Sequence, residues 1–99
     1  MVKLITKFSV KDFNEWLKVF NDTESNDVRM KAGLKNPQIY RASDNGNVVI
    51  LITEWENIDK AKAFSQSAEL REGQQRAGVI SKPEVYVLQP LPIREVEKM

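Results

Sequence analysis

The chain has 99 residues, and its 15 Lys and Arg nearly balance its 14 Asp and Glu, which leaves a formal charge of +1. Because these charges are spread along the chain, the sequence gives no reason to expect binding to nucleic acid or to a membrane surface. It contains no histidine and no cysteine, which excludes disulfides, thiol nucleophiles, histidine-ligated haem and most transition-metal sites. We therefore expect no cofactor and no metal.

The size of the chain predicts one domain. We expect this domain at residues 1–89 and an extended tail at residues 90–99, where two prolines and several charges occur. Leu91 and Ile93 give that tail apolar side chains that can pack on a neighbour. No apolar run approaches the ~20 residues that span a bilayer, so we expect a cytoplasmic protein.

The first part of the chain predicts a strand followed by helix. Residues 2–9 alternate between apolar and polar positions, as a half-buried strand does. A helical stripe follows, and we interpret its aromatic residues as core packed on the sheet. The stripe consists of Phe13, Trp16, Leu17 and Phe20. After a polar break at residues 21–27, Val28 resumes a helical pattern that Gly33 is suited to end.

The middle of the chain predicts a β-hairpin. Pro37 disfavours helix in the residue before it, so residues 37–43 are predicted as a strand. Asn45-Gly46 suits a two-residue type I′ turn, which would place Tyr40 opposite Leu51, whereas a three-residue loop would change the pairing. Residues 48–55 are apolar on both faces and predict a central strand that is covered on both sides.

The last part of the chain predicts helix followed by a final strand. Asn57 is a suitable N-cap for a helix, Ser67 can restart it, and Gly78 can end a distinct last helix. Residues 83–89 are predicted as the fourth strand.

The predicted order is β-α-β-β-α-β, which is typical of a ferredoxin-like α+β sandwich with one antiparallel four-stranded sheet and its helices on one face. The right-handed crossover rule places the first and third strands in the centre of the sheet. We assign to the helix-covered face the more aliphatic set of side chains. This set is Val2, Leu4, Phe8, Val48, Ile50, Ile52, Val85 and Val87.

The remaining strand side chains are left for the open face of the sheet. They are Lys3, Ile5, Lys7, Gln38, Tyr40, Ala42, Val49, Leu51, Thr53, Trp55, Glu84, Tyr86 and Leu88. This set is too apolar for solvent and too polar for a plain core, so we expect it to form a homodimer interface and the floor of a pocket for an aromatic ligand. The candidate pocket residues are Trp55, Tyr40, Tyr86, Leu51, Thr53, Lys7, Gln38 and Glu84, with Arg76 at the rim.

Several short motifs extend over residues 2 to about 89. They are Val10-Lys11-Asp12-Phe13, Arg41 before the hairpin, Val48-Val49-Ile50-Leu51 leading into Glu54-Trp55, Ala61-Lys62-Ala63-Phe64, Ser67-Ala68-Glu69-Leu70-Arg71, Ala77-Gly78-Val79 and Pro83-Glu84-Val85-Tyr86. Together they resemble the dimeric α+β barrel superfamily, and within it the small domains similar to antibiotic biosynthesis monooxygenases.

That resemblance implies a homodimer in which two sheets pack into a barrel, with a pocket between each sheet and its helices or within the barrel. It also implies, for some members, oxidation of phenolic polyketides by oxygen without a cofactor, in a pocket of Trp, Asn, Tyr and Arg. Trp55 matches the strand-end tryptophan of those oxidases, but Leu51 stands where they carry asparagine. Two functions therefore remain open: a homodimer that binds a small, mostly apolar ligand, and a cofactor-independent monooxygenase or cyclase acting on a phenolic or polyketide substrate.

Overall fold

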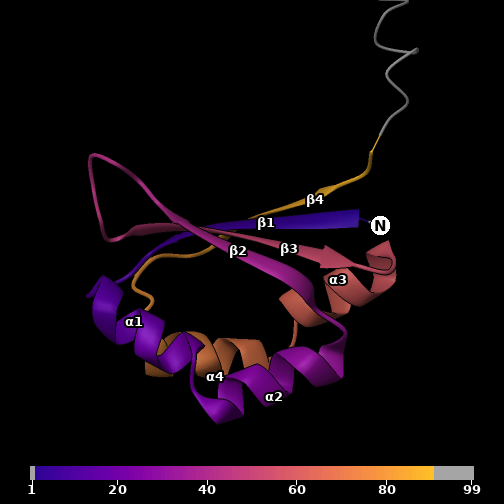
Figure 1. Cartoon of the computed structure of the whole chain (residues 1–99), viewed down its shortest axis with the longest axis horizontal. Helices are drawn as coiled ribbons and strands as arrows, with labels where there is room; N and C mark the ends of the chain where they lie inside the picture. The colour runs from indigo at the N-terminus through magenta and orange to yellow at the C-terminus, as the bar shows by residue number, and fades with distance from the viewer. Residues whose placement is uncertain (1, 91–99) are drawn as a thin grey trace, which may run out of the picture.

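The computed structural model describes residues 2–90, in which four strands form one antiparallel sheet with the order β2-β3-β1-β4. The strands are β1 (Val2–Ser9), β2 (Lys35–Arg41), β3 (Val48–Trp55) and β4 (Glu84–Leu88). The helices are α1 (Phe13–Phe20), α2 (Thr23–Ala32), α3 (Ile58–Ser65) and α4 (Ala68–Ala77). All four helices lie on one side of the sheet (Figure 1). The predicted ferredoxin-like α+β fold, with the first and third strands in the centre, is confirmed.

The ends of the helices are set by local hydrogen bonds. The side chain of Asn57 accepts from the backbone N–H of Lys60 at the start of α3, and Ser67 does the same for Leu70 at the start of α4. Gly33 and Gly78 follow α2 and α4 with positive φ angles of 95° and 81°, the conformation that glycine adopts without strain. The breaks that the sequence predicts within its two helical regions therefore divide each region into two helices.

The core consists of two clusters, each built around one tryptophan. The first contains the buried residues Leu4, Leu34, Trp55, Ala61 and Phe64. The second contains Phe8, Val10, Trp16, Val49 and Ala77. Both clusters lie between the sheet and the helices, and the candidate site lies between them.

The predicted register of the β2–β3 hairpin is wrong by one residue. Tyr40 pairs with Ile50 and Gln38 with Ile52, instead of with Leu51 and Thr53. Neither residue of the Asn45-Gly46 pair has a positive φ angle, so the connection is not a type I′ turn. The Arg41 side chain covers Gly46 and donates to its carbonyl at 3.1 Å, so the glycine provides space for a close approach.

The predicted faces of β3 are exchanged as well, and this is a separate error, because the pairing with β1 decides which side chains of β3 the helices cover. Leu4 pairs with Thr53, and Phe8 pairs with Val49, so the odd-numbered residues of β3 face the helices. The predicted assignment is wrong for this strand. The open face instead carries Lys3, Ile5, Lys7, Gln38, Tyr40, Val48, Ile50, Ile52, Glu54, Glu84, Tyr86 and Leu88.

Two other expectations from the sequence concern membrane-spanning segments and the boundary of the domain. Every helix within residues 2–90 is too short and too polar to cross a bilayer. The division into a domain at residues 1–89 and a tail at residues 90–99 stays a prediction, because residues 91–99 lie outside the described part of the chain.

Candidate functional site

A cavity of about 540 Å³ lies between the helix-covered face of the sheet and the helices. Cavities of this size hold small organic ligands in many proteins. The strands provide its floor through Leu4, Thr6 and Phe8 of β1, Leu51 and Thr53 of β3, and Val85 of β4. The helices provide its walls through Trp16, Val19, Phe20, Val28, Phe64, Leu70 and Ala77, among others.

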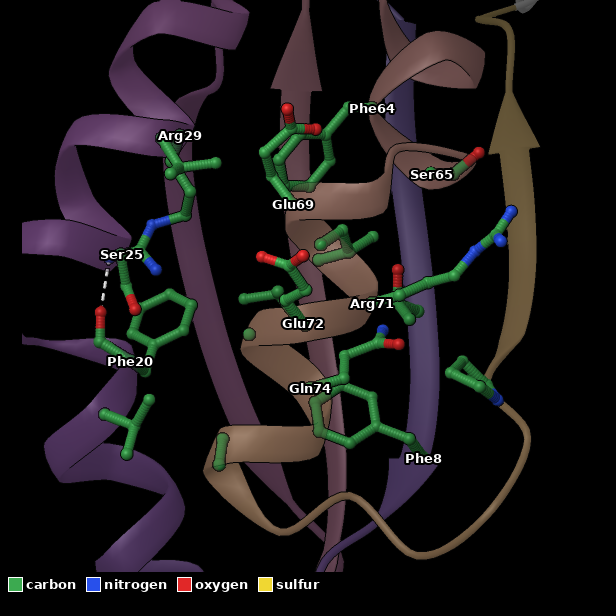
Figure 2. Close-up of a pocket in the computed structure, with 18 of the residues that line it drawn as sticks. Phe8, Phe20, Ser25, Arg29, Phe64, Ser65, Glu69, Arg71, Glu72 and Gln74 are labelled. Carbon is green, nitrogen blue, oxygen red and sulfur yellow. Dashed lines mark hydrogen bonds between the residues drawn. The ribbon is translucent and has the colours of Figure 1, made fainter.

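Aromatic side chains define both ends of the cavity. Phe64 of α3 lies at one end and Phe8 of β1 at the other, with α4 running between them (Figure 2). Trp16 bridges Phe8 and Phe20, with ring centroids 5.5 Å and 5.0 Å away. These packed rings form preformed flat surfaces, which suit a flat and mostly apolar ligand.

Arg29 of α2 places a positive charge beside this aromatic wall. Its guanidinium lies 3.8 Å from the centroid of the Phe20 ring and donates a hydrogen bond to the Phe20 carbonyl oxygen. Burial lowers the pKa of Arg29 below its ordinary value, and the nearby Asp22 carboxylate acts in the opposite direction. The group remains a cation at neutral pH, since arginine has so high an ordinary pKa.

Arg76 connects α4 to the start of α2 and closes one side of the cavity. Its guanidinium lies 2.7 Å from a carboxylate oxygen of Glu24 and donates to the hydroxyl of Ser25 at 2.8 Å. Asp22 is a third partner at 3.6 Å. This network links α4 to α2, and α4 also packs on α1.

The rim of the cavity is charged, although its interior is apolar. Glu69, Arg71, Glu72 and Lys82 line it from exposed positions on α4 and on the segment before β4. Within residues 2–90, no group of three or more carboxylate, histidine or cysteine side chains is placed to hold a metal ion. The cavity is therefore suited to binding an organic molecule through its apolar surface, with charges at the entrance.

The structure separates the predicted pocket residues into two sets. Leu51, Thr53 and Arg76 line the cavity on the helix side, and Trp55 is buried next to it. Five others lie on the open face, and the prediction that they share a face with Trp55 is wrong because the odd-numbered residues of β3 face the helices. These five are Lys7, Gln38, Tyr40, Glu84 and Tyr86.

The two tryptophans differ in how they relate to the cavity. Trp16 is a buried core residue, as predicted from the sequence, and in addition it lines the cavity. Trp55 is fully buried behind Phe64, with ring centroids 5.0 Å apart. The sequence did not predict that Arg29 lies beside the cavity, or that Phe8, Phe20 and Phe64 line it. A signal was available for the aromatic residues, because all three lie on the apolar face of their strand or helix.

The sequence matches no family model, and the search of curated proteins finds no match. The fold, in contrast, is similar to several solved structures. One is a protein from Bordetella bronchiseptica, provisionally named an antibiotic biosynthesis monooxygenase, with a TM-score of 0.74 and 18% identity over 92% of this chain and 97% of that one. Another is SnoaB from Streptomyces nogalater, described as a cofactor-independent oxygenase, with a TM-score of 0.66 and 16% identity over 91% of this chain and 94% of that one.

A third similar structure is Rv0793 from Mycobacterium tuberculosis, with a TM-score of 0.64 and 19% identity over 92% of this chain and 95% of that one. At these identities the likeness shows the fold. The resemblance that the sequence motifs suggest, to antibiotic biosynthesis monooxygenase-like domains, is thereby confirmed at the level of the fold.

Proposed function

We propose that this protein is a homodimer in which each subunit binds a small, mostly apolar ligand, aromatic or polyketide-like, in the cavity beneath its helices. The observation that carries the proposal is the cavity itself, with a volume of about 540 Å³ and walls of aromatic and aliphatic side chains. Such a space between a sheet and its covering helices is large enough for a ligand of two or three fused rings.

The open face of the sheet supports the dimer. Ile52, Ile5 and Tyr86 lie side by side across three strands, and Ile50 lies next to this row. Tyr86 is 55% exposed. Monomers rarely leave a contiguous apolar surface of this kind in water, and a two-fold axis allows such a surface to cover itself.

Trp16 provides the test of the binding site, because it lines the cavity whereas Trp55 lies behind Phe64. A ligand in the cavity should change the fluorescence of Trp16 directly. We expect a saturable change with aromatic ketones or phenols that is lost in Trp16→Phe and retained in Trp55→Phe. A signal that follows Trp55 instead, or no saturable change from a broad phenolic and polyketide panel, would contradict the cavity as the site.

The second candidate function is a cofactor-independent monooxygenase or cyclase, and the similarity of the fold to SnoaB favours it. The ionisable residues of the pocket predicted from the sequence lie on the open face and not in the cavity, with the exception of Arg76. They are Lys7, Tyr40, Glu84 and Tyr86. The ionisable groups that do line the cavity are Glu24, Arg29, Glu69, Arg71, Glu72, Arg76 and Lys82.

Oxygen consumption separates the two candidates. An oxygenase should consume oxygen with an anthrone substrate in the absence of added flavin or metal, and alanine variants of Glu69 and Glu72 would then test the carboxylates at the rim. Saturable binding without oxygen uptake would favour the non-catalytic function. The cytoplasmic location expected from the sequence stays a prediction.

A further inference from the structure

Thr53 is the one buried polar side chain of the described residues, with only 2% of its surface exposed. It lies on β3 opposite Leu4, faces the helices and lines the floor of the cavity. Its neighbours there, among them Leu51 and Phe64, are apolar. A polar group in such surroundings is costly unless its hydrogen-bonding capacity is used.

In its side-chain hydrogen bond, the Thr53 hydroxyl oxygen is the acceptor. The indole Nε1–H of Trp55 donates to Thr53 Oγ1 at 2.8 Å. A threonine hydroxyl also carries one proton that it can donate. Among residues 2–90, no acceptor is present for that proton, so the hydroxyl retains an unused donor at the cavity floor.

Trp55 also fixes the position of this donor. Its ring is fully buried and packs on Phe64, so the indole N–H holds one lone pair of the Thr53 oxygen in place. The hydroxyl proton is thereby restricted to the remaining directions around the oxygen. A donor that is already oriented loses little entropy when a ligand binds.

We propose that Thr53 donates a hydrogen bond to a carbonyl oxygen of the ligand, and that the cavity therefore selects aromatic ketones over hydrocarbons of the same shape. This inference rests on the proposed ligand-binding function. Thr6, the diagonal neighbour of Thr53 on β1, adds a second hydroxyl to the same floor. Because the Thr53 hydroxyl is buried and Thr6 is half-buried, a matched oxygen on the ligand is favourable and its absence is unfavourable.

The test compares two ligands of nearly equal shape, 1-tetralone and its hydrocarbon counterpart tetralin, by calorimetric titration. One neutral hydrogen bond contributes about 1 kcal/mol, or roughly a five- to tenfold change in affinity. We expect Thr53→Val to weaken 1-tetralone by that factor and to leave tetralin within about twofold, whereas Thr53→Ser should retain the preference for the ketone. The carbonyl stretching frequency of bound 1-tetralone should be lower in the wild type than in Thr53→Val.

Thr53→Val also leaves the Trp55 indole N–H without an acceptor, so the same comparison is made in a Trp55→Phe background, where that N–H is absent. If both ligands bind but Thr53→Val weakens them equally, or not at all, in both backgrounds, the inference is wrong and the binding function stands. If neither ligand binds to the wild type, the proposed function fails and the inference fails with it.

Discussion

The open face of the sheet provides the strongest prediction about assembly, through the substitution Ile5→Glu. Ile5 is the centre of the apolar row, with Ile52 on one side and Tyr86 on the other. Burial of an isoleucine side chain contributes about 1.5–3 kcal/mol, and a two-fold interface contains the residue twice. Because Ile5 is already half-buried in the protomer, the lower end applies, which gives about 3 kcal/mol per dimer.

A loss of about 3 kcal/mol raises the dissociation constant of the dimer roughly a hundredfold, and the introduced carboxylates add repulsion. Sedimentation velocity over a concentration series measures this shift. Ile80→Glu is the matched control, because Ile80 is 68% exposed and lies outside the sheet. A wild-type monomer at micromolar concentration, or an Ile5→Glu variant that dimerises as tightly as the Ile80→Glu control, would refute the reasoning.

Two further predictions concern the helices that cover the cavity. The backbone N–H of Ser25 holds the pKa of Asp22 below its ordinary value of 3.8, so the stabilisation from ionised Asp22 is present above that pH and is lost as the pH falls through the lower, folded-state pKa. Thermal melts from about pH 5 to about pH 2 should therefore show the wild type losing stability relative to Asp22→Asn, in which the asparagine caps α2 without titrating. A difference in melting temperature between the two proteins that stays constant over this pH range would contradict the prediction. In α4, Gly73→Ala should stabilise the protein by about 0.5–1 kcal/mol, since a Cβ there meets no atom within 4 Å. Gly78→Ala should destabilise the protein by about 1 kcal/mol because of the positive φ angle at Gly78. If chemical denaturation showed that both substitutions change the free energy of unfolding in the same direction, the assignment of the helix end would be contradicted.

Much of the fold could be predicted because its signals are local. The alternation in residues 2–9, the aromatic helical stripe and the two glycines after α2 and α4 each indicate one element. The order of these elements then leaves few topologies. Local signals of this kind explain why the sheet and its central strands were predicted correctly.

The faces of β3 could not be predicted from the same signals. Val48, Ile50 and Ile52 are as apolar as Val49, Leu51 and Trp55, so the alternation in this strand favours neither register. The assignment therefore depended on which set is the more aliphatic, and that criterion placed Val48, Ile50 and Ile52 under the helices. The register of the hairpin depended separately on the turn, where the sequence favours a two-residue loop. The longer connection in the structure allows the Arg41 guanidinium to lie 4.1 Å from the ring centroid of Phe13, a contact between distant segments that the Asn-Gly signal does not contain.

The candidate site was only partly predictable for the same reason. Leu51 and Thr53 were predicted as pocket residues and do line the cavity, but they were grouped with open-face residues such as Tyr40 because the faces of β3 were assigned the wrong way round. Arg29 belongs to a helix with no buried residues, so its pattern alone gave no reason to place it beside an aromatic wall. Its position depends on how α2 packs relative to Phe20, which is a tertiary property.

Methyl chemical shifts test the central claim, that the cavity beneath the helices is the ligand site. Leu4, Leu51 and Leu70 line the cavity, whereas Ile5, Ile50 and Ile52 lie on the open face. Titration of methyl-labelled protein with 1-tetralone should shift the leucine signals in a saturable manner and leave those of the isoleucines in place. Shifts confined to the isoleucines would place the ligand on the open face and would contradict this account.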